Sequence, residues 1–133
     1  MKNTLALVLM VFVSFGAFAK EINLRCECYS NKGFDKTGYF NKSCKGLISV
    51  KVNEGLFSKS FTVIDGYDRN VQGETTFGEN FIEWRLKESS VIRSYVLERN
   101  GLILTKGFTQ TKPQGGIRNS SYKDHKCIRV DGL

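Results

Sequence analysis

The sequence predicts an all-β protein: a single small antiparallel domain, either a meander barrel or a two-sheet sandwich, with about seven to eight strands tied by disulfides. The dominant period of the apolar residues is two, and no convincing apolar stripe of helical period is found. Proline occurs once and glycine 13 times, spaced as punctuation between the apolar runs. Four cysteines complete the pattern.

The N-terminus has the three parts of a secretory signal peptide. Lys2 gives the charged start, residues 5–18 form an almost wholly apolar run, and Ala17-Phe18-Ala19 supplies small residues for cleavage. The run is shorter than the roughly 20 residues that a membrane-spanning helix needs. We therefore expect a signal peptide over residues 1–19, cleaved after Ala19. The mature chain, residues 20–133, would be one β domain without a transmembrane segment, periplasmic or secreted.

Export decides how the cysteines are interpreted, because four cysteines in an oxidising compartment most often form two disulfides. Cys26 and Cys28 point to the same face of an expected strand, about 7 Å apart, and should not bond each other. Each then pairs with Cys44 or Cys127, and the sequence leaves both assignments open. Either assignment ties the first strand to the last.

A metal site is the alternative use of these sulfurs. His125 and Cys127, with Cys26 and Cys28, would offer soft ligands suited to zinc or Cu(I). Structural zinc sites favour paired ligands two to four residues apart, which Cys26-x-Cys28 does not match. We therefore expect disulfides, and neither a metal nor another cofactor.

The expected strands follow one another with short turns between them. Residues 21–29 alternate well and place Cys26 and Cys28 on the inner face. The polar stretches 31–45 and 109–121 are expected to be loops, and Asn53-Glu54-Gly55 a short hairpin turn. The remaining expected strands are 47–52, 56–64, 72–77, 81–87, 91–98, 102–108 and 122–130.

The clearest hairpin joins residues 91–98 to 102–108. Asn100-Gly101 is the favoured pair for a type I′ turn, in which both central residues need positive φ. Such a turn places Leu97 opposite Leu104 and Val96 opposite Thr105. Since no helical crossover separates the strands, antiparallel pairing is expected throughout.

Three features of the second half form a loose motif over roughly residues 80–130: Ile82-Glu83-Trp84, the run from Tyr95 to Gly101, and the late Cys127. In this the chain is similar to small exported bacterial proteins of uncharacterised function. Those carry an apolar-x-Trp strand, a Leu-x-Arg strand end with a glycine turn, and a C-terminal cysteine. The resemblance implies an exported bacterial β protein and implies no activity.

The chain is basic, with 20 Lys and Arg against 13 Asp and Glu and a net charge of +7. Basic residues are concentrated late in the chain, with Phe108, Tyr122 and His125 among them. Cations and rings in this combination suit an anionic polymer. The candidate ligand-binding residues on this basic C-terminal face are Lys106, Lys112, Arg118, Lys123, Lys126 and Arg129.

Signals of catalysis are weak. His125 is the single histidine, expected on the surface of the last strand, and Asp124 would point to the opposite face rather than orient it. Carboxylate pairs suited to acid–base work are limited to Glu83 with Glu98 and Asp65 with Asp68. We expect the former on a solvent face and the latter in a turn.

The sequence thus favours an exported, non-enzymatic binding module that recognises an anionic envelope component or a protein partner. Two alternatives stay open: a small envelope hydrolase using surface carboxylates or His125, and an envelope accessory or immunity-type protein acting through protein contacts. The partner and the oligomeric state are left open.

Overall fold

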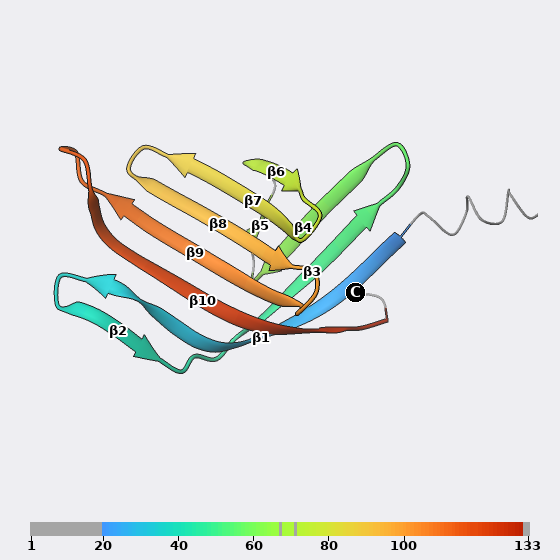
Figure 1. The fold of residues 1–133 in the computed structure, drawn as a ribbon, viewed down its shortest axis with the longest axis horizontal. Coiled ribbons are helices and arrows are strands. Elements are labelled where there is room, and N and C mark those ends of the chain that lie inside the picture. Colours follow the sequence, from blue (N-terminus) through green and yellow to red (C-terminus); the bar gives the residue numbers. More distant parts are fainter. Residues whose placement is uncertain (1–19, 67, 71, 132–133) are drawn as a thin grey trace, which may run out of the picture.

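The computed structural model describes residues 20–66, 68–70 and 72–131, which form one curled antiparallel sheet of ten strands (Figure 1). The predicted all-β antiparallel class is confirmed. The expected signal peptide, residues 1–19, lies outside the described residues. In the part of the chain that the structure describes, no helix is long and apolar enough to cross a membrane.

Strands β1, β9 and β10 are longer than the sequence suggested, β4 and β6 are shorter, and the short strands β2 and β5 were not predicted. Their bounds are β1 Lys20–Asp35, β2 Gly38–Lys42, β3 Leu47–Glu54, β4 Lys59–Asp65, β5 Asp68–Arg69, β6 Glu74–Phe77, β7 Phe81–Glu88, β8 Val91–Glu98, β9 Ile103–Thr111 and β10 Ile117–Arg129.

The first and last strands are neighbours at the centre of the sheet. The strand order is β5-β4-β3-β1-β10-β9-β8-β7-β6, and β2 pairs separately with β1. The chain therefore runs outward from β1 to one edge at β5, crosses to the opposite edge at β6, and returns strand by strand to β10. The edges themselves are the short strands β5 and β6, which limits unwanted pairing with other chains.

Strand β1 divides its pairing between two partners. Its first half pairs with β3, its second half pairs with β2, and β10 runs along its other side with a register shift between Cys28 and Ser30. The predicted loop over 31–45 is therefore wrong, since most of it forms a β-hairpin. Pairing with β10 gives these polar residues ladder hydrogen bonds that their side chains do not predict.

The expected loop over 109–121 is also largely strand. β9 runs to Thr111 and β10 begins at Ile117, so the connection between them is short. Lys112 N donates to Gly116 O at 3.0 Å and Gly115 N donates to Lys112 O at 3.0 Å within this turn. Both misassigned loops belong to the same wing of the sheet, where strands pair over long sequence separations.

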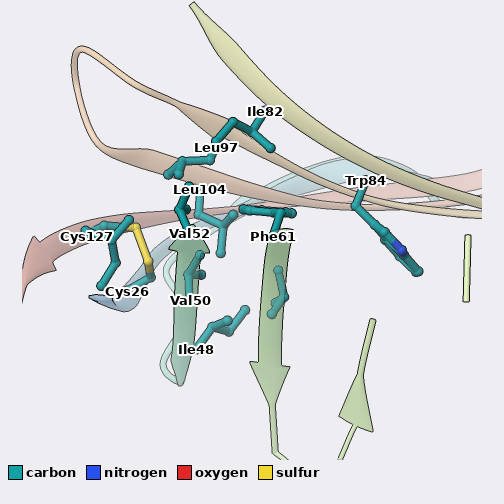
Figure 2. Packing of buried hydrophobic residues seen from close by; sticks show 12 residues of the cluster. Cys26, Ile48, Val50, Val52, Phe61, Ile82, Trp84, Leu97, Leu104 and Cys127 are labelled. Carbon is teal, nitrogen blue, oxygen red and sulfur yellow. A yellow bond between two sulfur atoms is a disulfide. The ribbon is translucent and has the colours of Figure 1, made fainter. Parts of the chain in front are cut away.

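Both disulfides form at the centre of the sheet. Cys26 and Cys127 are directly opposite each other on β1 and β10 and are bonded (Figure 2). Cys28 is bonded to Cys44, which holds the β2–β3 connection against the point where β1 changes partners. Cys28 N also donates to Gly46 O at 2.9 Å. The two bridges indicate an oxidising, extracytoplasmic environment.

The core fills the inner face of the curled sheet at one end of the strands. Leu24, Val50 and Leu104 are completely buried, and side chains from β3, β4, β7, β8 and β9 converge there (Figure 2). The full cluster comprises Leu24, Cys26, Ile48, Val50, Val52, Phe61, Val63, Ile82, Trp84, Leu97, Leu104 and Cys127.

The register of the β8–β9 hairpin is as predicted, with Leu97 opposite Leu104 and Val96 opposite Thr105. Its turn is not the predicted type I′. The unpaired residues are 99–102, and the positive φ of the turn lies at Leu102 (φ 51°) rather than at Asn100 and Gly101. Arg99 leaves the ladder because its N–H donates to Asn80 O at 2.9 Å.

Arg99 also joins the two halves of the curled sheet. Its guanidinium makes a bidentate contact with the Glu54 carboxylate at the end of β3, with Nη2 3.1 Å from Oε2. Its Nε donates to Gly78 O at 3.0 Å. A fork-to-fork pair of this kind fixes geometry as well as adding attraction. This contact therefore holds the two halves of the curled sheet together at the end of the strands where the core lies.

Removing the Cys26–Cys127 bridge should destabilise the protein more than removing the other bridge. It links residues 101 apart, against 16 for Cys28–Cys44. The chain-entropy model gives about 4–5 kcal/mol for the longer loop and about 3 kcal/mol for the shorter one. Urea unfolding of the double Cys→Ala variants measures both losses, and an equal or reversed order would contradict the assigned pairing.

Two glycine substitutions test the strand packing and the turn. A Cβ on Gly33 would lie 1.9 Å from Ser120 O, so Gly33→Ala should lower the free energy of unfolding by about 1–3 kcal/mol. A Cβ on Gly101 meets nothing closer than 3.4 Å, and its φ is not positive, so Gly101→Ala should be nearly neutral. A loss at Gly101 as large as that at Gly33 would favour the type I′ turn instead.

Candidate functional site

A hollow of about 410 Å³ opens on the inner face of the sheet, beyond the core. It is lined by β7, β8, β9 and β10 on one side and by residues of β5 and the β5–β6 connection on the other. This volume is within the range of small-molecule sites. The residues that give it its chemistry are Arg69, Trp84, Arg93, Lys106, Phe108 and Lys123.

The strand register explains why these side chains meet. Residues directly opposite on antiparallel strands share a face of the sheet. Trp84 is opposite Tyr95, Tyr95 is opposite Lys106, and Lys106 is opposite Lys123. Four residues distant in sequence therefore form one row across β7 to β10.

The Trp84 indole lines the hollow. Its Nε1 donates to Gln72 O at 2.6 Å, and its ring centroid lies 5.4 Å from that of Tyr95. Gly73 lies so close that a Cβ there would be 2.8 Å from the indole. The β5–β6 connection is thus fastened to Trp84, which is only 5% exposed.

Strand β4 is held near the same place by a side chain that follows the edge strand β5. Asn70 Oδ1 accepts from Val63 N at 2.5 Å, and Asn70 Nδ2 donates to Phe61 O at 2.7 Å. The amide continues the hydrogen bonding of the ladder beyond the two residues of β5. This fixes the position of the neighbouring lining residues Asp68 and Arg69.

Asp65, at the end of β4, contacts residues of β8 and β9 across the inside of the curled sheet. Its carboxylate forms an ion pair with Lys106 and accepts a hydrogen bond from Tyr95 Oη at 3.0 Å. Burial alone would raise the pKa of the Asp65 carboxyl, but Lys106 and the Tyr95 hydroxyl together hold it below its usual value. Burial first, and then the Asp65 charge, raise the pKa of Tyr95.

His125 lies buried beside the hollow, not on the surface as expected. Its strand β10 is central rather than terminal in space, and its side chain shares the inner face with Cys127. Its Nδ1 lies 3.1 Å from Lys123 O. Burial lowers the pKa of His125 more than nearby carbonyls raise it. Asp124 points to the other face, as expected, where Thr105 Oγ1 donates to it at 2.8 Å.

The six basic residues predicted as a ligand-binding face do not form one surface. Lys106 and Lys123 meet in the hollow. Lys112 lies in the β9–β10 turn and Arg118 at the register shift that follows it. Lys126 alternates with Cys127 and faces outward, while Arg129 ends β10.

The sequence analysis missed Arg69 and Arg93, which supply the other cations of the hollow. Arg93 had a usable signal: the predicted β8–β9 register already sets it opposite Phe108 and on the face of Tyr95. Arg69 had none, because its position depends on Asn70 and on the crossing between sheet edges.

Of the two candidate carboxylate pairs, the structure places Asp65 directly opposite Asp68 on β4 and β5. Glu83 and Glu98 alternate with the buried Ile82 and Leu97 and so lie on the outer face. Asp65 is engaged by Lys106 and Tyr95, as described above. Within residues 20–66, 68–70 and 72–131, no three His, Cys, Asp or Glu side chains gather as metal ligands. The four cysteines form the two disulfides Cys26–Cys127 and Cys28–Cys44.

Comparisons of this chain with protein-family models, with curated proteins and with solved structures give no match. The fold and the hollow define its class: a disulfide-bonded all-β protein with a cationic, aromatic-lined hollow on the inner face of its sheet.

The burial of His125 predicts how the protein responds to acid. As the only histidine, it gives an unambiguous NMR titration, and its pKa should lie below the usual value of about 6.5. The unfolded chain then takes up the proton first, so the free energy of unfolding should fall as pH drops below about 6.5. Urea midpoints of wild type and His125→Gln over this range measure it; a titration at or above 6.5 would contradict the buried position.

Proposed function

We propose that this protein is an exported, non-enzymatic binding module that holds an anionic ligand in the hollow of its curled sheet. The observation that carries the proposal is the pairing of Lys106 with Lys123 on the inner face. Like charges directly opposite each other destabilise a sheet. Asp65 offsets part of that cost at Lys106, and an anion bound at Lys123 would remove the rest.

The charge balance of the hollow supports an anionic ligand. Its lining has four cations, Arg69, Arg93, Lys106 and Lys123, against the single carboxylate of Asp68. Lys106 is neutralised by Asp65, but no ion pair within the described residues includes Arg93 or Lys123. The net charge is +7 for the whole chain and +6 without Lys2 of the expected leader (19 Lys and Arg against 13 Asp and Glu), and it would also draw anions toward the molecule.

The apolar side chains of the hollow support a ligand with an apolar or ring-shaped part. Trp84, Leu86 and Phe108 line it next to the cations. Apolar walls with a few placed charges are the usual composition of a small-molecule site. The ligand class is therefore an anion attached to a ring or a short apolar group.

The cellular setting is part of the same proposal. We place the mature protein in the periplasm or the medium of a bacterium, after cleavage at Ala19, on the strength of the leader pattern and of the resemblance to small exported bacterial proteins. The ligand would then be an anionic component of the cell envelope. The disulfides support the extracytoplasmic part of this placement.

One observation favours a second candidate, an accessory protein that acts through protein contacts. The tip of the β3–β4 hairpin carries Leu56, 60% exposed, and Phe57, fully exposed. The strand expected over residues 56–64 included both of them. In the structure Gly55 N donates to Ser58 O at 2.9 Å and closes a turn before β4 begins. Two exposed apolar side chains on a protruding tip suit an apolar pocket on a partner.

The anion-binding proposal is tested with a matched pair of ligands. Phenyl β-D-glucuronide and phenyl β-D-glucoside share a ring and differ in the carboxylate. Trp84, the only tryptophan, should report binding through its fluorescence. We expect the glucuronide to bind at least about tenfold more tightly, since hydrogen bonds to charged groups are worth about 1.5–3 kcal/mol.

Variants separate the hollow from the rest of the basic surface. The double variant Lys123→Gln/Arg93→Gln should lose the preference for the glucuronide. Lys112→Gln/Arg118→Gln, with the same change in net charge outside the hollow, should keep it, as should Leu56→Ser/Phe57→Ser at the hairpin tip. Equal binding of both ligands, or an equal loss in the Lys112/Arg118 variant, would refute the proposal.

A further inference from the structure

The hollow is one end of a longer feature of the inner face. The row through Lys106 and Lys123 continues beyond β10, because Lys123 is opposite Asn31 on β1 and Asn31 is opposite Lys42 on β2. The complete row comprises Trp84, Tyr95, Lys106, Lys123, Asn31 and Lys42. The row beside it comprises Leu86, Arg93, Phe108, Ser121, Gly33 and Phe40.

We infer that these two rows form a track that binds a linear anionic glycan, with the hollow as the site of one sugar unit. This inference rests on the proposed function and extends it to a ligand class. The track crosses β7, β8, β9, β10, β1 and β2, and Figure 1 shows these strands side by side along the curled sheet. Five strand spacings of about 4.8 Å give it a length of about 24 Å, more than one small ligand fills.

The spacing of the cations suits a repeating charge. Lys106 and Lys123 lie on adjacent strands, and Lys42 lies two strands beyond Lys123, about 10 Å farther along the sheet. No ion pair within the described part of the chain includes Lys123 or Lys42. A single acidic head group cannot reach both, whereas a chain with a carboxylate or sulfate on successive units can.

Between Phe108 and Phe40 the track has only small side chains. Gly33 and Ser121 are opposite each other, flanked by Phe108 on β9 and Phe40 on β2. A side chain at Gly33 is excluded by the close approach of Ser120 O. The track therefore stays open between the hollow and the β2 wing.

The side chains in the track favour a glycan over a nucleic acid. Binding of single-stranded nucleic acid depends on exposed ring faces on which bases stack. Trp84 is 5% exposed, the Tyr95 hydroxyl is bonded to Asp65, and the Phe40 ring has the Lys42 ammonium 5.5 Å from its centroid.

Asn31 adds a second preference for a hydroxyl-bearing ligand. Its Oδ1 is buried and has no hydrogen-bond partner among the residues that the structure describes. Turning the amide toward a ligand therefore breaks no bond to this oxygen. A sugar hydroxyl can donate to it, whereas a phosphodiester backbone offers only acceptors.

The test is a length series of oligogalacturonides, from one unit to six, measured by calorimetry and by Trp84 fluorescence. Affinity should rise over several units and then level off once the track is filled. Lys42→Glu should weaken binding of the longest oligomer at least about fivefold and leave binding of phenyl β-D-glucuronide in the hollow unchanged. Lys36→Glu, in the β1–β2 turn outside both rows, makes the same change in net charge and should have little effect.

The outcomes keep this inference apart from the proposed function. Affinity that is flat with length, or equal losses in the Lys42 and Lys36 variants, would overturn the track while glucuronide binding in the hollow stands. Failure to bind both the glucuronide and every oligomer would overturn the proposed function itself. An oligo(dT) series that binds as tightly as the glycan at each length would overturn the glycan assignment. Urea midpoints equal to wild type confirm that the variants are folded.

Discussion

The antiparallel pairing of β1 with β10 is the interaction on which the rest of the structure depends. These are the longest strands, they come from opposite ends of the described chain, and together they form the middle of the sheet. Every other strand is added outward from this pair. The Cys26–Cys127 bond lies directly between the two strands, so it lowers the entropy of the unfolded chain at the contact that closes the longest loop.

This central pair also decides where the molecule is apolar and where it is polar. From β1 and β10 the sheet curls so that its two halves face each other. At the end held by Arg99 and Glu54 the halves meet, and the inner face is filled by residues such as Leu104 and Val50. Farther along the same strands the facing half ends at Asp65 and β5, and a hollow opens. The same alternation then places Lys106 where two residues earlier it placed Leu104.

Much of the fold could be predicted from the sequence, and the features that could not be predicted have physical causes. The alternation in residues 21–29 predicts that strand and its buried face. Both faces of the hairpin over residues 91–108 carry apolar side chains, so the sequence does not say which face is buried. The Leu97–Leu104 register was predicted from the Asn100-Gly101 turn and is confirmed, although the turn type is not. An oxidising compartment predicts two disulfides from four cysteines. The distance between neighbouring same-face positions of a strand excludes a bond between Cys26 and Cys28. The sequence could not choose the partners, because Cys44 and Cys127 are equally available until β10 is seen to lie beside β1. It also failed where polar segments pair over long separations, as in residues 31–35 with β10.

The candidate site, too, could be predicted only in part from the sequence. A search along the chain groups Lys106, Lys112, Arg118 and Lys123 because they are close in sequence, yet strand geometry sends them to a hollow, a turn and a register shift. What selects Lys106 and Lys123 is that they lie opposite each other and on one face, a property of pairing rather than of composition. Arg93 joins the site for the same reason, because strand pairing places it on the inner face opposite Phe108. Its own strand has no cluster of basic residues that would single it out. Cross-strand rows are thus the natural unit in which to seek a site on a curled sheet: each strand contributes one side chain to a row, and neighbouring rows two residues along supply the complementary chemistry.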